Sequence, residues 1–322
     1  MADAGPPRRG QLERWVSFGT TIIAPATILG AVLFYFGYVS ARAQYAYFGI
    51  DVDTIGLSTR DYVMRSPQPL LVPLLVLTLL GVGVLALHTA MRSRIANATT
   101  SEAPTSLTRI RNLVRWATAG GLTVLGVGIA LLFAFPYLRD WTAYSLVTPL
   151  VIGLGAALFA YGLHLLGVVD EQITGQRAQA REPPSSVVLR RLTQVLMAVV
   201  VVASIFWATA TVAQWSGRGL AQYDARHLDR LPSIILDTKE RLYLTNGCQR
   251  PDDPNGGCIA ETVLPMSDGQ TYRYRYRHFR LLIEGHDRMF LVPDIWSATN
   301  STLVVPLDGS VRIQFQFENQ AP

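Results

Sequence analysis

Five apolar runs constrain this chain more than any other feature of its sequence. Each run is about 20 residues long, the length that an α-helix needs to cross a hydrocarbon core. None of the five contains Asp, Glu, Lys or Arg. We predict transmembrane helices at Ser17–Val39, Pro69–Ala90, Trp116–Pro136, Leu146–Val168 and Leu192–Ala213. The chain then divides into an N-terminal segment (1–16), a five-helix domain (17–214) and a C-terminal segment (215–322).

Arginines in the connecting segments predict the orientation of these helices, because basic residues near span ends are retained in the cytoplasm. Twelve arginines lie in the N-terminal segment and the second and fourth loops, against four in the first and third loops. We therefore predict a multi-pass protein of the cytoplasmic membrane with a cytoplasmic N-terminus and an extracytoplasmic C-terminal domain. A cleaved signal peptide ending at Ala41-Arg42-Ala43 is the alternative for the first run, and it leaves the C-terminus outside as well.

The C-terminal segment has the pattern of an all-β domain. Short alternating runs, separated by Gly, Pro, Asn and Asp, replace the continuous apolar runs from residue 216 onward. The predicted strands are Ser233–Asp237, Arg241–Thr245, Glu261–Leu264, Thr271–Arg277, Phe279–Glu284, Met289–Pro293, Thr302–Pro306 and Val311–Glu318. Gly285-His286-Asp287 reads as a hairpin turn. Strands of this number predict a small sandwich or open barrel.

The stretch TYRYRYRHFR alternates aromatic and basic residues. In a strand, its tyrosines lie on one face and its arginines on the other. One interpretation packs the tyrosines inward and leaves the arginines solvated or paired with acidic residues. The other makes the arginines a binding row for lipid phosphates or an anionic wall polymer. Nucleic acid is not an expected partner of an extracytoplasmic domain. The residues of this candidate row are Arg273, Arg275 and Arg277.

Cys248 and Cys258 are the two cysteines of the chain, and they lie in a loop rich in Gly, Pro, Asn and Asp. In an oxidising compartment such a pair predicts a disulfide that closes the loop. Two free thiols are the alternative. The spacing is not CxxC and the partner ligands of a zinc site are lacking, so we predict no metal site here.

Two further pairs of residues are candidates for chemistry. Asp51 and Asp53 lie in the predicted first outer loop, where paired acids also occur in sugar transferases that use lipid-linked donors; the alternative is that they form a turn. Ser58 or Thr59 in the same loop can cap a short helix. His88 and His164 both lie near the cytoplasmic ends of their spans, where a histidine pair could approach closely enough to bind metal or relay a proton. The alternative for each histidine is an interfacial side chain with a water or backbone partner.

The sequence has no phosphate-binding glycine loop, no GxSxG and no HExxH, and we predict no cofactor. The absence of these motifs does not exclude an enzyme, but it leaves no catalytic residue to name. The leading hypothesis is a membrane protein of unknown activity whose outer domain binds a partner protein, a lipid headgroup or an envelope polymer. The first alternative is an envelope enzyme that acts on a lipid-linked substrate through Asp51 or Asp53. The second is a transporter or channel subunit that forms its pore as a homo-oligomer, with small residues such as Gly126 and Gly128 packing helices closely.

Two stretches carry a resemblance to a known group of proteins: YFGIDVDTIGLSTRDYVMRS after the first run, and YRYRYRHFRLLIEGHDRMFLVPDIW in the outer domain. With the order of the spans, they resemble uncharacterised multispanning membrane proteins of Streptomyces and related actinobacteria. The resemblance implies a bacterial source and this topology. It assigns no activity and no catalytic residue.

Overall fold

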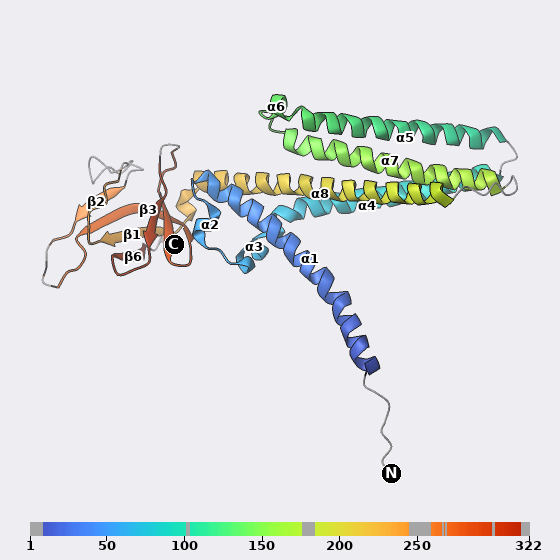
Figure 1. Ribbon diagram of the computed structural model, residues 1–322. Coiled ribbons are helices and arrows are strands. Elements are labelled where there is room, and N and C mark those ends of the chain that lie inside the picture. The colour runs from blue at the N-terminus through green and yellow to red at the C-terminus, as the bar shows by residue number, and fades with distance from the viewer. Residues whose placement is uncertain are drawn as a thin grey trace, which may run out of the picture. The chain divides into compact units, whose positions relative to one another are not determined.

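The computed structural model describes the backbone of residues 9–100, 104–175, 184–244, 259–265, 267, 269–297 and 300–316. The chain forms two compact units (Figure 1). Unit 1 comprises Met1–Pro69 together with Ala213–Pro322, and unit 2 comprises Leu70–Val212. Each unit is described by itself.

Five helices are long and apolar enough to cross a membrane, as the sequence predicted. They are α1 (Arg9–Tyr47), α4 (Pro67–Thr100), α5 (Pro104–Phe133), α7 (Tyr144–Gly175) and α8 (Pro184–Arg226). The short helices are α2 (Val52–Ile55), α3 (Thr59–Arg65), α6 (Phe135–Leu138) and the 3-10 turn η1 (Leu228–Arg230). The 43 residues of α8 span about 65 Å at 1.5 Å per residue, roughly twice the thickness of a hydrocarbon core.

Glycines allow α5 and α7 of unit 2 to lie side by side (Figure 1). A Cβ atom at Gly155 of α7 would overlap the backbone of Leu125, and a Cβ at Gly128 of α5 would stand 2.6 Å from Ile152 Cγ1. Gly126 faces open space. Gly128 and Gly155 therefore allow the close contact between these two helices, whereas Gly126 takes no part in it.

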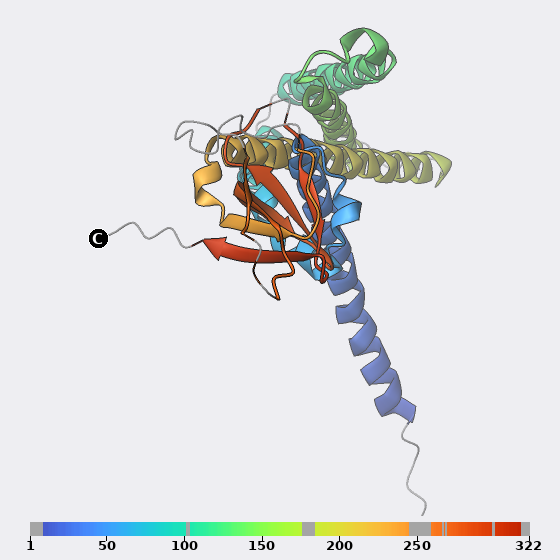
Figure 2. The same ribbon diagram turned by 90° about the vertical axis from the view of Figure 1, so that its left-hand side faces the viewer.

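The strands of unit 1 form one antiparallel sheet that does not close on itself (Figure 2). Its order is β5-β4-β3-β1-β6, and β2 pairs with β3. The strand bounds are β1 (Ser233–Thr238), β2 (Ala260–Val263), β3 (Tyr274–Glu284), β4 (Arg288–Pro293), β5 (Leu303–Pro306) and β6 (Val311–Gln316). The hairpin predicted at Gly285-His286-Asp287 joins β3 to β4, and the amide of Gly285 donates to the carbonyl of Arg288 at 2.8 Å.

Two strand predictions were wrong. Thr271–Arg277 and Phe279–Glu284 are not separate, because β3 runs through His278, which adopts the left-handed region with φ at 70°. Ile234 pairs with Phe279 and Leu236 with Tyr276, so β3 holds one extra residue in this interval, as in a β-bulge. Arg241–Leu244 is not a strand; instead the amide of Leu242 donates to the hydroxyl of Tyr276 at 2.7 Å.

Apolar side chains cover both faces of the sheet. One face packs with Leu242, Leu244 and Ile259 around Tyr276 and Phe279. The other face packs against helix ends from both parts of unit 1. We call the cluster of buried residues at this contact the stalk core. The stalk core consists of Ala41, Tyr45, Phe48, Ile50, Val52, Ile55, Tyr62, Ala221, Ala225, Leu228, Ile283, Phe290 and Val292.

Candidate functional site

The predicted arginine row does not act as one set in the structure. Arg275 forms a bidentate ion pair with Asp237 of β1: its Nε lies 2.8 Å from Oδ1 and its Nη2 lies 3.0 Å from Oδ2. Arg312 of β6 reaches the same carboxylate at 2.6 Å from Nη2 to Oδ2. The side chain of Asp237 is fully buried between them. Arg275 therefore joins two strands of the sheet through an ion pair, in agreement with the interpretation that pairs these arginines with acidic residues.

The other two arginines of the row are exposed. The guanidinium of Arg273 lies 6.0 Å from the ring centroid of Tyr274. Neither Arg273 nor Arg277 forms an ion pair with a residue that the structure describes. The tyrosine side of the stretch faces inward as predicted, and Tyr276 is only 1% exposed.

Asp51 and Asp53 have structural partners in and around α2. Asp51 is the N-cap of α2, and its Oδ1 accepts from the amide of Asp53 at 3.3 Å. Asp53 Oδ2 accepts from the hydroxyl of Tyr38 on α1 at 3.2 Å. Both carboxylates remain exposed, so capping leaves their outer oxygens accessible to a ligand.

The predicted short helix after them is confirmed. Ser58 and Asp61 form a capping box at the start of α3. Its Tyr62 is buried, with ring centroids 5.4 Å from those of Phe34 and Tyr38. This helix therefore packs inward against α1 through Tyr62.

The histidine pair of unit 2 does approach closely. The ring centroids of His88 and His164 are 6.2 Å apart, and His88 Nδ1 lies 3.4 Å from the hydroxyl of Tyr161. Within the described residues, no group of three His, Cys, Asp or Glu side chains gathers as a metal site would require. Cys248 and Cys258 lie outside the described residues, so their disulfide stays a prediction.

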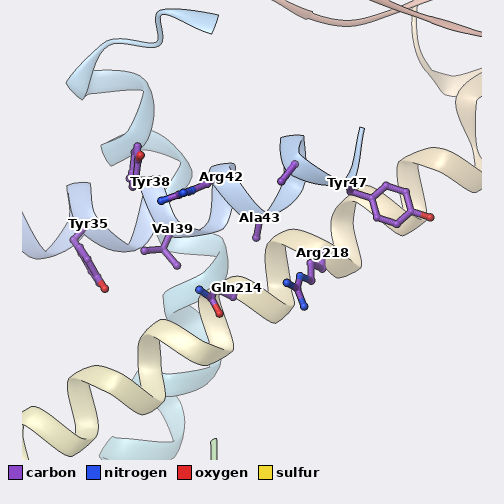
Figure 3. Close-up of a pocket in the computed structure, with 9 residues that line it drawn as sticks. Tyr35, Tyr38, Val39, Arg42, Ala43, Tyr47, Gln214 and Arg218 are labelled. Carbon is purple, nitrogen blue, oxygen red and sulfur yellow. The ribbon is translucent and has the colours of Figure 1, made fainter. Parts of the chain in front are cut away.

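The most developed candidate site is a hollow between α1 and α8 in unit 1, which we call the arginine hollow (Figure 3). Its volume is about 490 Å³, within the range of small-molecule sites. Tyr35, Tyr38 and Arg42 come from α1, while Gln214 and Arg218 come from α8. The hollow thus combines two cations with aromatic and amide side chains from helices far apart in the sequence.

Close packing of the two helices creates this hollow. A Cβ atom at Gly217 of α8 would overlap the carbonyl oxygen of Ser40 on α1. Gln44 Nε2 on α1 donates to Asp224 Oδ2 on α8 at 3.1 Å, which holds the helix ends together. The hollow is therefore built by backbone contact and does not depend on the charges that line it.

The two guanidinium groups of the arginine hollow have no counterion in the described part of the chain. No hydrogen bond or ion pair joins Arg42 or Arg218 to another described residue, and both are exposed. The carboxylates of Asp224 and Asp53 accept hydrogen bonds from Gln44 and Tyr38 and form no ion pair with either arginine. Two guanidinium groups without an ion-pair partner among the described residues, lining one hollow, favour an anionic ligand with several acceptor oxygens.

The arginine hollow was not predicted from the sequence, because both helices extend beyond the apolar runs that predicted them. Helix α1 continues past Val39 to Tyr47, and α8 continues past Ala213 to Arg226. The signal for the extension is helical spacing of apolar residues beyond the apolar runs, at Ala41, Tyr45 and Phe48 and again at Ala221 and Ala225.

Comparisons of the chain with protein-family models, with curated proteins and with solved structures gave no match, so the arginine hollow is interpreted from its geometry and charge alone.

Proposed function

We propose that this protein is a multi-pass membrane protein that binds the headgroup of an anionic lipid in the arginine hollow. The single observation that carries the proposal is that the guanidinium groups of Arg42 and Arg218 line one hollow between two apolar helices and form no ion pair with a described residue. A phosphate offers several acceptor oxygens, which matches the fixed donors of two guanidinium groups.

The depth of the two arginines supports a lipid ligand. Arg42 lies three residues beyond the apolar run ending at Val39, and Arg218 lies five beyond the run ending at Ala213. At 1.5 Å per residue they stand about 4–8 Å outside the hydrocarbon core. The headgroup layer is about 5–8 Å thick on each side of that core. With these ends of the apolar runs, the proposal puts both cations at the level of lipid phosphates.

The side of the membrane follows from the arginine asymmetry of the loops, which supports a cytoplasmic N-terminus and an outer arginine hollow. A membrane-impermeant maleimide should label Cys248 and Cys258 in intact cells only after reduction, because the loop is outside and the thiols are paired. Labelling that requires cell lysis would contradict the orientation. Labelling before reduction would keep the orientation and contradict the disulfide.

Lipid retention tests the binding proposal directly. Full-length protein, exchanged into detergent from membranes that contain phosphatidylglycerol and phosphatidylcholine, should retain phosphatidylglycerol preferentially when analysed by native mass spectrometry. The double variant Arg42→Gln, Arg218→Gln should lower the affinity for phosphatidylglycerol about 30-fold, because it removes two charged hydrogen bonds that contribute roughly 1 kcal/mol each where water competes.

The matched control is Arg60→Gln. Arg60 is an exposed arginine of α3 that does not line the arginine hollow. Its replacement removes one positive charge from the same unit and should leave lipid retention unchanged. Equal loss in the control and the double variant, or equal retention of both lipids by the native protein, would contradict the proposal.

A further inference from the structure

A second hollow of about 840 Å³ lies beside the arginine hollow in unit 1, and we call it the aromatic hollow. Its walls come from the turn after α1, the start of α2, strands β4 and β5, and the segment between those strands. Buried Phe48 and Phe290 contribute to its lining. Ala46 and Tyr47, at the C-terminal end of α1, line both hollows, so the two hollows are neighbours.

Aromatic rings form a rigid wall of the aromatic hollow. Trp296 stacks on Tyr47 with ring centroids 5.4 Å apart and meets Phe48 edge-on at 5.1 Å. Trp296 is only half-buried. Its indole N–H donates to no acceptor among the residues that the structure describes. The wall therefore offers an apolar surface together with a free hydrogen-bond donor.

Polar groups complete the rim. Asp51 Oδ1 is occupied by the cap of α2, whereas its Oδ2 has no hydrogen bond within the described residues. Ser301 is exposed and lines the hollow with Thr54. The one charged side chain in the described lining is thus a carboxylate, which disfavours a phosphate in this hollow and favours a neutral ligand with hydroxyl groups.

A sugar fits this combination of surfaces. The C–H face of a pyranose packs on aromatic rings, while its hydroxyl groups donate to carboxylate and hydroxyl oxygens and accept from an indole N–H. The volume of the aromatic hollow is within the range of small-molecule sites. A sugar here and a phosphate in the arginine hollow would both contact Tyr47, which lines both hollows.

We infer that the aromatic hollow binds the sugar of a lipid-linked saccharide whose phosphate lies between Arg42 and Arg218. The inference rests on the proposed function and names its ligand class: a lipid phosphate that carries a sugar. Asp51 and Trp296 are then specificity residues that distinguish such a ligand from a lipid phosphate without a sugar.

Binding of two probes to the full-length protein in nanodiscs tests this inference. The plain probe is the methyl ester of a polyprenyl phosphate, and the glycosylated probe carries one hexose in place of the methyl group, so both are phosphodiesters with one negative charge. We expect the glycosylated probe to bind about 10-fold more tightly than the plain probe. The variant Asp51→Ser should reduce this difference to about 3-fold or less without changing the affinity for the plain probe, because serine keeps the N-cap of α2 but shortens the acceptor.

Trp296→Leu is the second variant and should likewise reduce the difference in affinity between the two probes. If this replacement disturbs the stalk core, on which Trp296 packs, the comparison with Asp51→Ser still tests the inference. Arg42→Gln with Arg218→Gln should weaken both probes equally, since it removes the phosphate contacts that they share. Equal affinity of the native protein for both probes would overturn the inference while leaving the lipid proposal intact. If neither probe binds, or if the arginine variant binds the plain probe as tightly as the native protein does, the lipid proposal fails and this inference fails with it.

Discussion

Replacing Gly217 by alanine should lower the free energy of unfolding of unit 1 by about 2–3 kcal/mol, the cost of forcing an extra group into a packed site. The added methyl group would overlap the carbonyl oxygen of Ser40. Backbone atoms of two helices cannot give way as a flexible side chain can, so α1 and α8 must separate. Their separation would disturb Ala41, Ala221 and the rest of the stalk core.

Gly219 is the matched control for this prediction, because it lies one residue beyond Arg218 on the same helix and has no atom near its Cβ position. Gly219→Ala should stabilise α8 by about 0.5–1 kcal/mol through helix propensity alone. Pulse proteolysis of the full-length protein in increasing urea, followed on fragments of the C-terminal domain, measures both changes. Destabilisation by both variants to the same extent would show that helix contact at Gly217 is not the cause.

Asp237→Asn should lower the free energy of unfolding of unit 1 by about 2–4 kcal/mol. The variant keeps the shape of the side chain but leaves Arg275 and Arg312 without their buried counterion, and breaking one partner of a buried ion pair is costly. Arg312 is 48% exposed, which places the expected cost toward the lower part of this range. Arg312→Gln, the control, should cost about 1 kcal/mol or less, because Asp237 keeps both hydrogen bonds from Arg275.

The pH dependence of unfolding gives an independent measure of the same contact. Burial acts to raise the pKa of Asp237, but hydrogen bonds from Arg275 and Arg312 outweigh burial and place the pKa below its ordinary value of 3.8. The carboxylate therefore stabilises the folded state fully above pH 3.8 and loses this contribution as the pH falls through its lowered pKa. Urea unfolding at pH 7 and at pH 3 should show a smaller drop in stability for Asp237→Asn than for the native protein. Equal drops would contradict the assignment.

Local sequence patterns predicted two kinds of element: apolar helices long enough to cross a membrane, and strands that pair with a neighbour in the sequence. The five apolar runs predicted the five long helices, since length and hydropathy alone decide whether a helix can cross a membrane. Alternation predicted the inward face of β3, and Tyr276 is buried as expected. The turn at Gly285 was predicted because the strands on either side of it pair directly with each other.

Contacts between distant segments escaped prediction for a physical reason. Arg42 and Gln44 follow an apolar run and look like loop residues, yet they lie in α1 because Asp224 and Ala221, about 180 residues later, bury the other side of the helix. Arg275 was grouped with its neighbours because alternation does not reveal that Asp237 lies opposite it on β1. The two arginines of the hollow belong to different helices, so no local pattern joins them.

The stalk core joins two parts of the chain that are synthesised at very different times. The hydroxyl of Thr302 donates to the carbonyl of Phe48 across 254 residues of sequence. At about 5–20 residues per second, a ribosome needs roughly 10–50 s to make the intervening chain. Throughout that interval Phe48, Val52 and Ile55 are made but have no sheet to cover them. Biogenesis of this protein must therefore keep an apolar helix end from aggregating until β4 and β5 are made, and a chain that stops before β4 never completes unit 1.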